Sequence, residues 1–173
     1  MKKQIRKGVF ETNSSSTHSI CISKAPATIG KEVEFCADEY GWENDCVYDT
    51  ASYLYTAILE MHDSEELLEK LKDILDRNSI KYKFYTPSEY GWYIDHAYDT
   101  REFIESVLAD EDMLMRYLFG NSCIYTGNDN QDCRPAGCNI AKETMWEYEG
   151  DKYITKPNPY HDSEHYDYFL KEN

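Results

Sequence analysis

Apolar and polar residues alternate in two short stretches near the start of the chain. These are residues 17–23, THSICIS, and residues 32–36, EVEFC, where Val33 and Phe35 share one side. Alternation with a period of two is typical of a strand with one buried face. We therefore expect two strands, joined by the turn-rich segment APATIGK at 25–31.

Further along, apolar residues recur at the spacing of an α-helix. One stripe runs over residues 53–61, a second over 64–78, and a third from residue 103 toward Phe119. Gly120 follows the third stripe directly and is a typical helix stop. The pattern predicts three helices, the third of them continuous up to this glycine.

The last third of the chain favours short strands. We expect a strand at 122–126, a hairpin formed by 145–148 and 153–155, and a short helix at 166–170 within the polar tail 156–173. Together these elements predict an α+β fold with about three helices and a small, mostly antiparallel sheet.

A twelve-residue segment occurs twice, fifty positions apart. Residues 39–50 read EYGWENDCVYDT and residues 89–100 read EYGWYIDHAYDT. Each copy follows a strand-like run and precedes a helical stripe, so we expect a strand–EYGW turn–helix unit over about 31–62 and again over about 81–119. Glycine suits the turn, the aromatic residues suit packing, and the Asp-Thr pair suits a helix cap.

The repeated carboxylates allow a second interpretation. A divalent cation prefers clustered carboxylate oxygens, and both copies supply acids. A helix cap and surface acids explain the same residues more simply, so we favour scaffold over metal. The acids concerned are Glu39, Asp45, Asp49, Glu89, Asp95 and Asp99.

The charge is strongly acidic and unevenly distributed. The chain has 173 residues, a length that fits a single domain. Its formal net charge is −15. Residues 1–31 hold six basic side chains against one acid, Glu11, so they carry +5 and the remaining 142 residues carry −20. An acidic surface of this kind repels nucleic acid and anionic lipid and attracts basic partners, although it also serves plain solubility.

The cysteines and the start of the chain point to a reducing compartment. The first residues, MKKQIRKGVFETN, lack the apolar part of a signal peptide, and no segment is long enough to span a membrane, so we expect a cytoplasmic protein with reduced thiols. A zinc site could use Cys123, Cys133 and Cys138 with His161 or His165. The cysteine spacing contains no CxxC, so we favour free thiols and predict neither a metal nor another cofactor.

One polar segment could bind a ligand. Residues 13–18, NSSSTH, precede an expected strand, and a Gly/Asn/Asp turn follows the strand expected at 122–126, so the two segments could meet at one end of a sheet. Hydroxyl and amide groups there would suit a nucleotide or another phosphate, and a serine with a histidine could act as nucleophile and base. A polar loop is the simpler interpretation. The candidate ligand-binding residues are Asn13, Ser14, Ser15, Ser16, Thr17, His18, Asn128, Asp129 and Asn130.

The stretches GVFETNSSSTHSI at 8–20 and IYTGNDN at 124–130 carry a resemblance. They resemble a group of short, mostly uncharacterised proteins encoded by phages and mobile elements of low-GC Gram-positive bacteria. The resemblance covers these two segments and implies a phage or prophage accessory protein inside a bacterial host cell. It implies no activity. Small acidic phage proteins often resemble inhibitors of host defence, including anti-CRISPR proteins and DNA mimics. An inhibitory role for this chain is therefore expected by analogy alone.

Two functions remain open from the sequence. The first is an acidic binding protein that inhibits a host nucleic-acid-handling defence protein, such as a CRISPR effector nuclease, with carboxylates in place of phosphates. The alternative is a small enzyme or phosphate-ligand binder that uses the NSSSTH segment. The chain contains no GxGxxG, P-loop, HExxH or GxSxG motif and no basic nucleic-acid motif, which favours the binding protein. Its candidate contact residues are Asp38, Glu39, Glu43, Asp45, Asp110, Glu111 and Asp112.

Overall fold

The computed structural model describes residues 16–41, 45–87, 91–128 and 138–171, which form an α+β fold as the sequence predicts. This part of the chain contains four α-helices, one more than expected: α1 Thr50–Leu59, α2 Ser64–Arg77, α3 Arg101–Ala109 and α4 Glu111–Phe119. Two 3-10 turns are η1 Ala97–Thr100 and η2 Cys138–Ala141. The strands are β1 Ser16–Ser23, β2 Glu32–Cys36, β3 Glu39–Tyr40, β4 Asp45–Val47, β5 Lys81–Tyr85, β6 Tyr93–Ile94, β7 Cys123–Asn128, β8 Thr144–Glu149, β9 Lys152–Pro157 and β10 Tyr166–Lys171.

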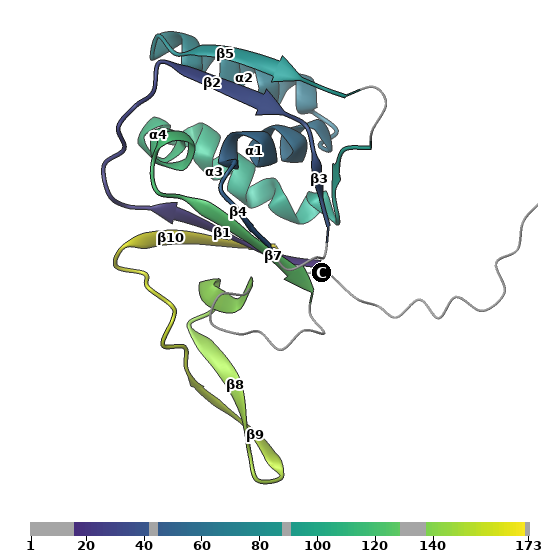
Figure 1. The fold of residues 1–173 in the computed structure, drawn as a ribbon, viewed down its shortest axis with the longest axis vertical. Coiled ribbons are helices and arrows are strands. Elements are labelled where there is room, and N and C mark those ends of the chain that lie inside the picture. Colours follow the sequence, from purple (N-terminus) through teal and green to yellow (C-terminus); the bar gives the residue numbers. More distant parts are fainter. Residues whose placement is uncertain (1–15, 42–44, 88–90, 129–137, 172–173) are drawn as a thin grey trace, which may run out of the picture.

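Helices α1, α3 and α4 lie between two sheets (Figure 1). One sheet has four antiparallel strands in the order β10-β1-β7-β4. On the other side of the helices β2 and β5 form a parallel pair, with α2 beside them. A short parallel pair, β3–β6, and an antiparallel hairpin, β8–β9, complete the described strands. The sheets are therefore small and mostly antiparallel.

Strand β1 is buried along its whole length because it has a strand on each side and a layer on each face. Ile20 lies opposite Phe169 of β10, and the Phe169 ring lies 5.7 Å from that of Phe103 in α3. The even-numbered side chains of β1 thus face the helices. The turn η2 lies against the other face of the sheet (Figure 1). This position explains why the polar residues of the NSSSTH segment that the structure describes are also buried.

Buried tyrosines form the centre of the core. Tyr53 and Tyr117 are fully buried, and the Phe103 ring packs 5.1 Å from that of Tyr117. The Tyr117 hydroxyl donates to the Thr50 carbonyl oxygen at 2.7 Å, and the Thr50 hydroxyl donates to the Tyr117 carbonyl oxygen at 2.8 Å. These reciprocal bonds satisfy the polar atoms that burial would otherwise leave without a partner. They also tie the first turn of α1 to α4.

The strands of the two repeat copies lie side by side. Strands β2 and β5 pair in parallel, with Phe35 opposite Phe84, and their rings stack at 4.8 Å. The copies enter their helices differently. Asp49 caps α1 and accepts from the Ser52 amide at 3.1 Å, as predicted, whereas the second copy first forms η1, and Thr100 makes no side-chain cap to α3. A common origin of the two units stays a prediction, and positions 42–44 and 88–90 of the EYGW segments lie outside the described residues.

Two predicted elements are wrong. The third helix is not continuous, because Asp110 has an extended backbone and separates α3 from α4. Its side chain caps the new helix by accepting from the Met113 amide at 3.1 Å. The tail at 166–170 is not a helix but strand β10, which adds to the edge of the sheet beside β1. The strand at 122–126 and the hairpin near 145–155 are confirmed.

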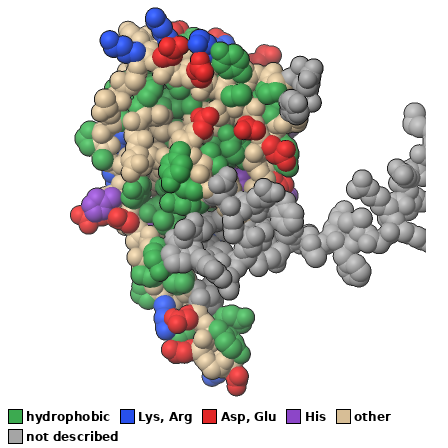
Figure 2. Space-filling view, in the orientation of Figure 1, with side chains coloured by type: hydrophobic (Ala, Val, Ile, Leu, Met, Phe, Trp, Pro, Cys, Tyr) green, Lys and Arg blue, Asp and Glu red, His purple; other side chains and the backbone are tan. Residues whose placement is uncertain are grey.

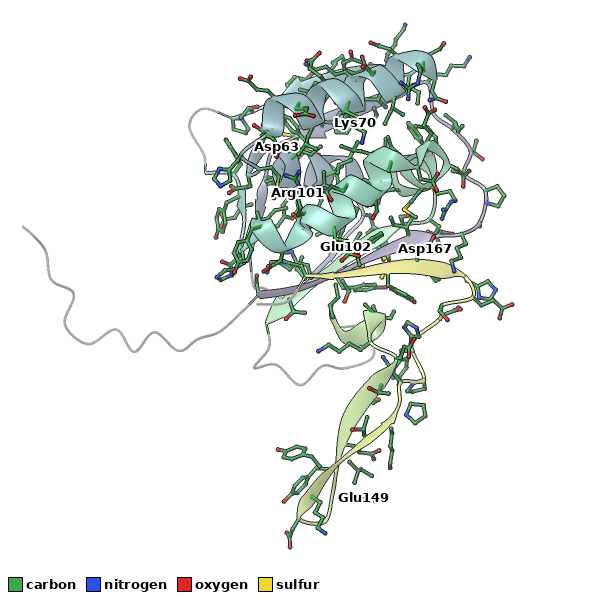
Figure 3. All side chains as sticks on the ribbon, turned by 180° about the vertical axis from the view of Figure 1, so that it is seen from behind. Asp63, Lys70, Arg101, Glu102, Glu149 and Asp167 are labelled. Atoms are coloured by element: carbon green, nitrogen blue, oxygen red, sulfur yellow. The ribbon has the colours of Figure 1, made fainter. Side chains whose placement is uncertain are left out.

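The hairpin β8–β9 projects away from the rest of the molecule (Figure 1). It carries acidic, basic and hydrophobic side chains in the space-filling view (Figure 2), and Glu149 lies near its tip (Figure 3). Its base is joined to the sheet through His161, whose ring lies 5.0 Å from that of Tyr168 in β10. Among the described residues of the hairpin, most side chains are exposed.

A bidentate ion pair links the start of α3 to the residue before α2. Arg101, the first residue of α3, donates from Nη1 to Asp63 Oδ1 at 2.6 Å and from Nη2 to Asp63 Oδ2 at 2.9 Å (Figure 3). Asp63 directly precedes α2, so this bidentate contact fixes α2 against α3. Among the described residues, no helix has both the length and the apolar character needed to cross a membrane.

Candidate functional site

The described part of the NSSSTH segment, residues 16–18, lies beside the end of β7 at one end of the four-stranded sheet. Ser16 pairs with Asn128, and Thr17 pairs with Gly127, where β1 begins and β7 ends. The expected juxtaposition is therefore present in the backbone. Asn13, Ser14, Ser15, Asp129 and Asn130 lie outside the described residues.

Ser16 is held by a buried lysine from the other end of the chain. Lys171 of β10 is fully buried, and its ammonium group donates to the Ser16 carbonyl oxygen at 2.7 Å and to the Ser16 hydroxyl oxygen. The Ser16 hydroxyl in turn donates to the Asp95 carbonyl oxygen at 3.0 Å. A nucleophilic serine would instead donate its proton to the lysine. The arrangement is a structural link between β1, β10 and the second repeat copy.

Both ring nitrogens of His18 are also occupied by hydrogen bonds within the protein. Its Nε2 lies 2.8 Å from the Gly41 carbonyl oxygen, which can only accept, so Nε2 carries the proton. Its Nδ1 lies 2.8 Å from the Tyr53 hydroxyl, which then donates to it. Burial, and next the positive charge of Lys171, lower the pKa of His18 to about 4. The neutral ring has no free lone pair and cannot serve as the base of a nucleophilic pair.

The five candidate contact acids whose side chains the structure describes do not form one patch. Asp38 and Glu39 are exposed beyond the C-terminal end of β2, where the Tyr93 hydroxyl donates to Glu39 at 2.7 Å. Asp110, Glu111 and Asp112 are exposed at the start of α4. Glu111 contacts Arg77 and Asn78, just before β5 begins. Because β2 and β5 run parallel, the two groups lie at opposite ends of this pair, roughly 15 Å apart for strands of this length.

Fewer observations bear on the remaining candidate acids and on the proposed metal ligands. Glu43 and the side chain of Asp45 lie outside the described residues, as do Glu89 and Cys133. His161 Nδ1 lies 3.2 Å from the Ile140 carbonyl oxygen, and His165 contacts Asp162 on the surface. Among the residues that the structure describes, no three His, Cys, Asp or Glu side chains are placed to hold a metal ion.

The most exposed aromatic pair is on the projecting hairpin, where the sequence predicts no contact residue. Tyr148 of β8 and Tyr153 of β9 are directly opposite, and their ring centroids are 5.2 Å apart. The two side chains are 60% and 73% exposed. Tyrosine is enriched in protein interfaces, so an exposed tyrosine pair is a candidate contact surface. In the sequence, the alternation in WEYE at 146–149 and KYIT at 152–155 is the signal that the two tyrosines lie on the same face of the hairpin.

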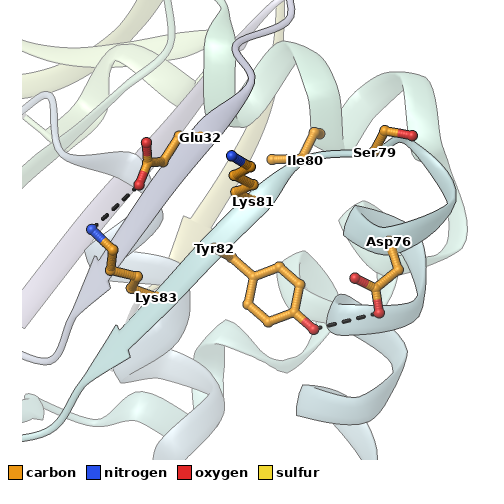
Figure 4. Close-up of a pocket in the computed structure, with 7 residues that line it drawn as sticks. All are labelled: Glu32, Asp76, Ser79, Ile80, Lys81, Tyr82 and Lys83. Atoms are coloured by element: carbon orange, nitrogen blue, oxygen red, sulfur yellow. Dashed lines mark hydrogen bonds and ion pairs between the residues drawn. The ribbon is translucent and has the colours of Figure 1, made fainter.

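A shallow pocket on the β5 side does not compete with the hairpin as a site (Figure 4). Two of its charged groups are paired with each other, because Lys83 contacts Glu32 at 3.3 Å, and Lys83 also contacts Glu34 at 2.8 Å. The Tyr82 hydroxyl donates to Asp76 at 3.4 Å on the same surface. Glu32, Asp76 and Lys83 are therefore already bound to other groups of the chain, which makes the pocket a weaker candidate than the hairpin.

Comparison with protein-family models, curated proteins and solved structures finds no match to this chain.

Proposed function

We propose that the chain is an acidic binding protein whose β8–β9 hairpin inserts its exposed tyrosine pair into a basic surface of another protein. The observation that carries this proposal is the position of Tyr148 and Tyr153 on an arm that, among the described residues, projects from the body. A two-stranded hairpin on its own is marginally stable in water, so an arm of this kind gains order from a docking partner. Tyrosine rings supply large contact areas at low entropic cost.

Charge supports a basic partner. The chain beyond residue 31 carries −20, and on the arm itself Glu147 and Glu149 flank Tyr148. Lys156 contacts both of these acids, at 2.7 Å and 3.4 Å, so they are positioned rather than free. A long-range acidic field would accelerate encounter with a basic surface, while the aromatic pair would supply contact area once docked.

The kind of partner follows from the resemblance of the N-terminal segment to phage-encoded proteins. We extend the proposal to a phage accessory protein that inhibits a nucleic-acid-handling defence protein of the bacterial host, such as a CRISPR effector nuclease. Such enzymes present basic surfaces that normally hold nucleic acid. The separation of the acids at Asp38–Glu39 from those at Asp110–Asp112 favours an aromatic arm over a continuous imitation of the phosphate backbone.

The test is an affinity pull-down of the tagged protein from host lysate, with mass spectrometry of the retained proteins. The comparison is between wild type, Tyr148→Ala/Tyr153→Ala, and Tyr98→Ala. Tyr98 is the matched control because it is 64% exposed but lies on the body of the protein. We expect a nucleic-acid-binding protein that wild type and the control retain, that the double variant loses, and that added salt or duplex DNA releases.

Two results would overturn the proposal. Retention of the same proteins by the double variant would remove the hairpin from the interface. Retention that neither salt nor DNA weakens would remove the basic nucleic-acid surface. The acidic contacts are tested in the same assay by reversing Asp38 and Glu39 in one variant and the three acids at 110–112 in another.

The meeting of Ser16 with Asn128 keeps a phosphate-ligand binder as the second candidate. A thermal-shift measurement with a panel of nucleotides and inorganic phosphate tests it directly. A ligand that binds only the folded protein raises the unfolding temperature with concentration. A panel without any shift would dismiss this candidate.

A further inference from the structure

Three thiols gather on the face of the four-stranded sheet that points away from the helices. Cys21 of β1 lies directly opposite Cys123 of β7, and Cys46 of β4 lies opposite Tyr125, two residues further along β7. Alternation places all three cysteines on the same side, because their neighbours Ile20 and Ile124 belong to the core between sheet and helices. Neither the charge pattern nor the proposed binding function uses this cluster.

The three thiols interact with one another and are not equivalent. Interaction with the Cys21 thiol, assisted by Tyr125 and Cys46, lowers the pKa of Cys123 to about 7 despite partial burial. The same interaction, followed by burial, raises the pKa of Cys21 well above its usual range. Burial raises the pKa of Cys46 as well. Cys123 is therefore the thiol of the cluster that ionises most readily.

Cys123 and Cys21 differ in solvent exposure, and this difference decides which thiol reacts first with a reagent in solution. Cys123 is partly exposed, so a small reagent can reach it, whereas Cys21 is only 2% exposed. A partly exposed thiolate is the usual first point of reaction with a disulfide or an electrophile. Cys21 is thus shielded from a reagent in solvent, while Cys123 lies directly opposite it.

Strand geometry selects the disulfide that can form. Residues directly opposite in an antiparallel pair have Cα atoms about 4.5 or 5.5 Å apart, within the range of about 4.4–6.8 Å that a disulfide requires. Cys21 and Cys123 meet this condition. Cys46 is diagonal to Cys123, and diagonal neighbours lie about 7–8 Å apart, beyond that range. Cys46 can therefore assist the thiolate but cannot bridge to it without a shift of the backbone.

We propose that Cys123 and Cys21 are a redox-active pair that low-molecular-weight disulfides convert into a cross-strand bond between β7 and β1. The Cys123 thiolate attacks one sulfur of the small disulfide, forms a mixed disulfide, and expels one thiolate. The Cys21 sulfur then attacks the Cys123 sulfur, the Cys21–Cys123 bond forms, and the second small thiolate leaves with the Cys21 proton. In total, two protein thiols are oxidised and one small disulfide is reduced to two thiols.

The experiment uses the full chain, reduced and freed of reductant, with oxidised glutathione as the probe. Remaining thiols are blocked with N-ethylmaleimide, and non-reduced peptides are mapped by mass spectrometry. Wild type should yield a peptide pair linked through Cys21 and Cys123. Cys21→Ser should stop at a glutathione adduct on Cys123, and Cys123→Ser should yield neither product. Exposed Cys36 lies on the distant β2–β5 pair, and Cys36→Ser is the matched control, which should behave as wild type.

A kinetic measurement distinguishes the pair from two unrelated thiols. Loss of the interaction with the Cys21 thiol should return Cys123 to an ordinary thiol, so alkylation of Cys123 at pH 7 should become roughly three- to six-fold slower in Cys21→Ala, which cannot donate a hydrogen bond. Cys36→Ser should leave that rate unchanged.

Three outcomes would overturn the proposal: a wild-type protein that stays reduced, a glutathione adduct confined to Cys36 or Cys46, or a linkage of Cys123 to any cysteine other than Cys21. Peptide mapping of the wild type alone distinguishes all three from the expected linkage, so the inference stays testable even if a buried substitution at Cys21 impairs folding.

Discussion

The buried neutral state of His18 should make the fold sensitive to acid in a defined pH range. In the unfolded chain His18 has a pKa near 6.5, whereas burial and then Lys171 lower it to about 4 in the folded protein. Between these two values the unfolded state binds more protons than the folded state. Stability from this residue is therefore fully present above pH 6.5 and is lost as pH falls toward 4.

The magnitude follows from the two pKa values. A difference of about 2.5 pKa units corresponds to about 3 kcal/mol at pH 4 and below, and about 2 kcal/mol of it is already lost at pH 5. This is a large part of the stability of an ordinary domain, about 5–15 kcal/mol. His18 is almost fully enclosed, so little solvent screening reduces the effect.

The assay is urea unfolding followed by circular dichroism at several pH values from about 7.5 to about 5, on wild type and His18→Gln. Glutamine does not titrate, and its amide can still donate to the Gly41 carbonyl oxygen and accept from the Tyr53 hydroxyl. All other titrating groups act in both proteins and cancel in the difference. We expect wild type to lose about 2 kcal/mol relative to the variant across this range.

Parallel stability curves for the two proteins would refute the reasoning. So would a nuclear magnetic resonance titration that places the midpoint of His18 in the folded protein near its unfolded value of 6.5. Either result would mean that the ring is solvated or that a neighbouring carboxylate, such as Asp95, compensates its charge.

Three further predictions concern stability and are checked by urea unfolding near neutral pH. Arg116 is mostly buried and donates to the Ser23 carbonyl oxygen at 2.8 Å, so Arg116→Met should lower the free energy of unfolding by about 1–3 kcal/mol, and an unchanged value would argue against this link. At Gly120 an added Cβ would collide with the Arg116 carbonyl oxygen, so Gly120→Ala should cost about 1–3 kcal/mol although its φ is negative. Leu71 is fully buried, so Leu71→Ala should cost about 2–5 kcal/mol, clearly more than the same change at half-buried Leu68.

Local pattern predicted most of the elements but failed where two signals compete. In the segment YDYFLK, Tyr166 with Phe169 and Leu170 has helical spacing, while Tyr166, Tyr168 and Leu170 alternate as in a strand. Six residues are too few to distinguish the two periods. The segment forms a strand because it pairs with the edge of β1. At Asp110 the cap signal is present, with two acids following it, but the apolar stripe on either side conceals the break.

The candidate site is less accessible to sequence reasoning because it depends on contacts across the chain. The local sequence around Ser16 and His18 favours an exposed polar loop, whereas Lys171 and Tyr53 enclose these residues from positions far along the chain. A buried lysine cannot be recognised from composition, since lysine is almost always exposed. The thiol cluster is hidden for the same reason, because strand register alone brings Cys21 opposite Cys123.

The position of β1 in the middle of the sheet has a consequence for the synthesis of the protein. His18 pairs with Thr126 and Lys171, which are translated 108 and 153 residues later. At synthesis rates of about 5–20 residues per second, the second neighbour arrives roughly 8–30 s after β1. Throughout this interval a strand that contains Ile20 and Ile22 lacks a complete set of partners, so the nascent chain is a natural client for chaperones. A chain that stops before β10 would leave that strand edge permanently open, and we expect such fragments to accumulate as aggregates.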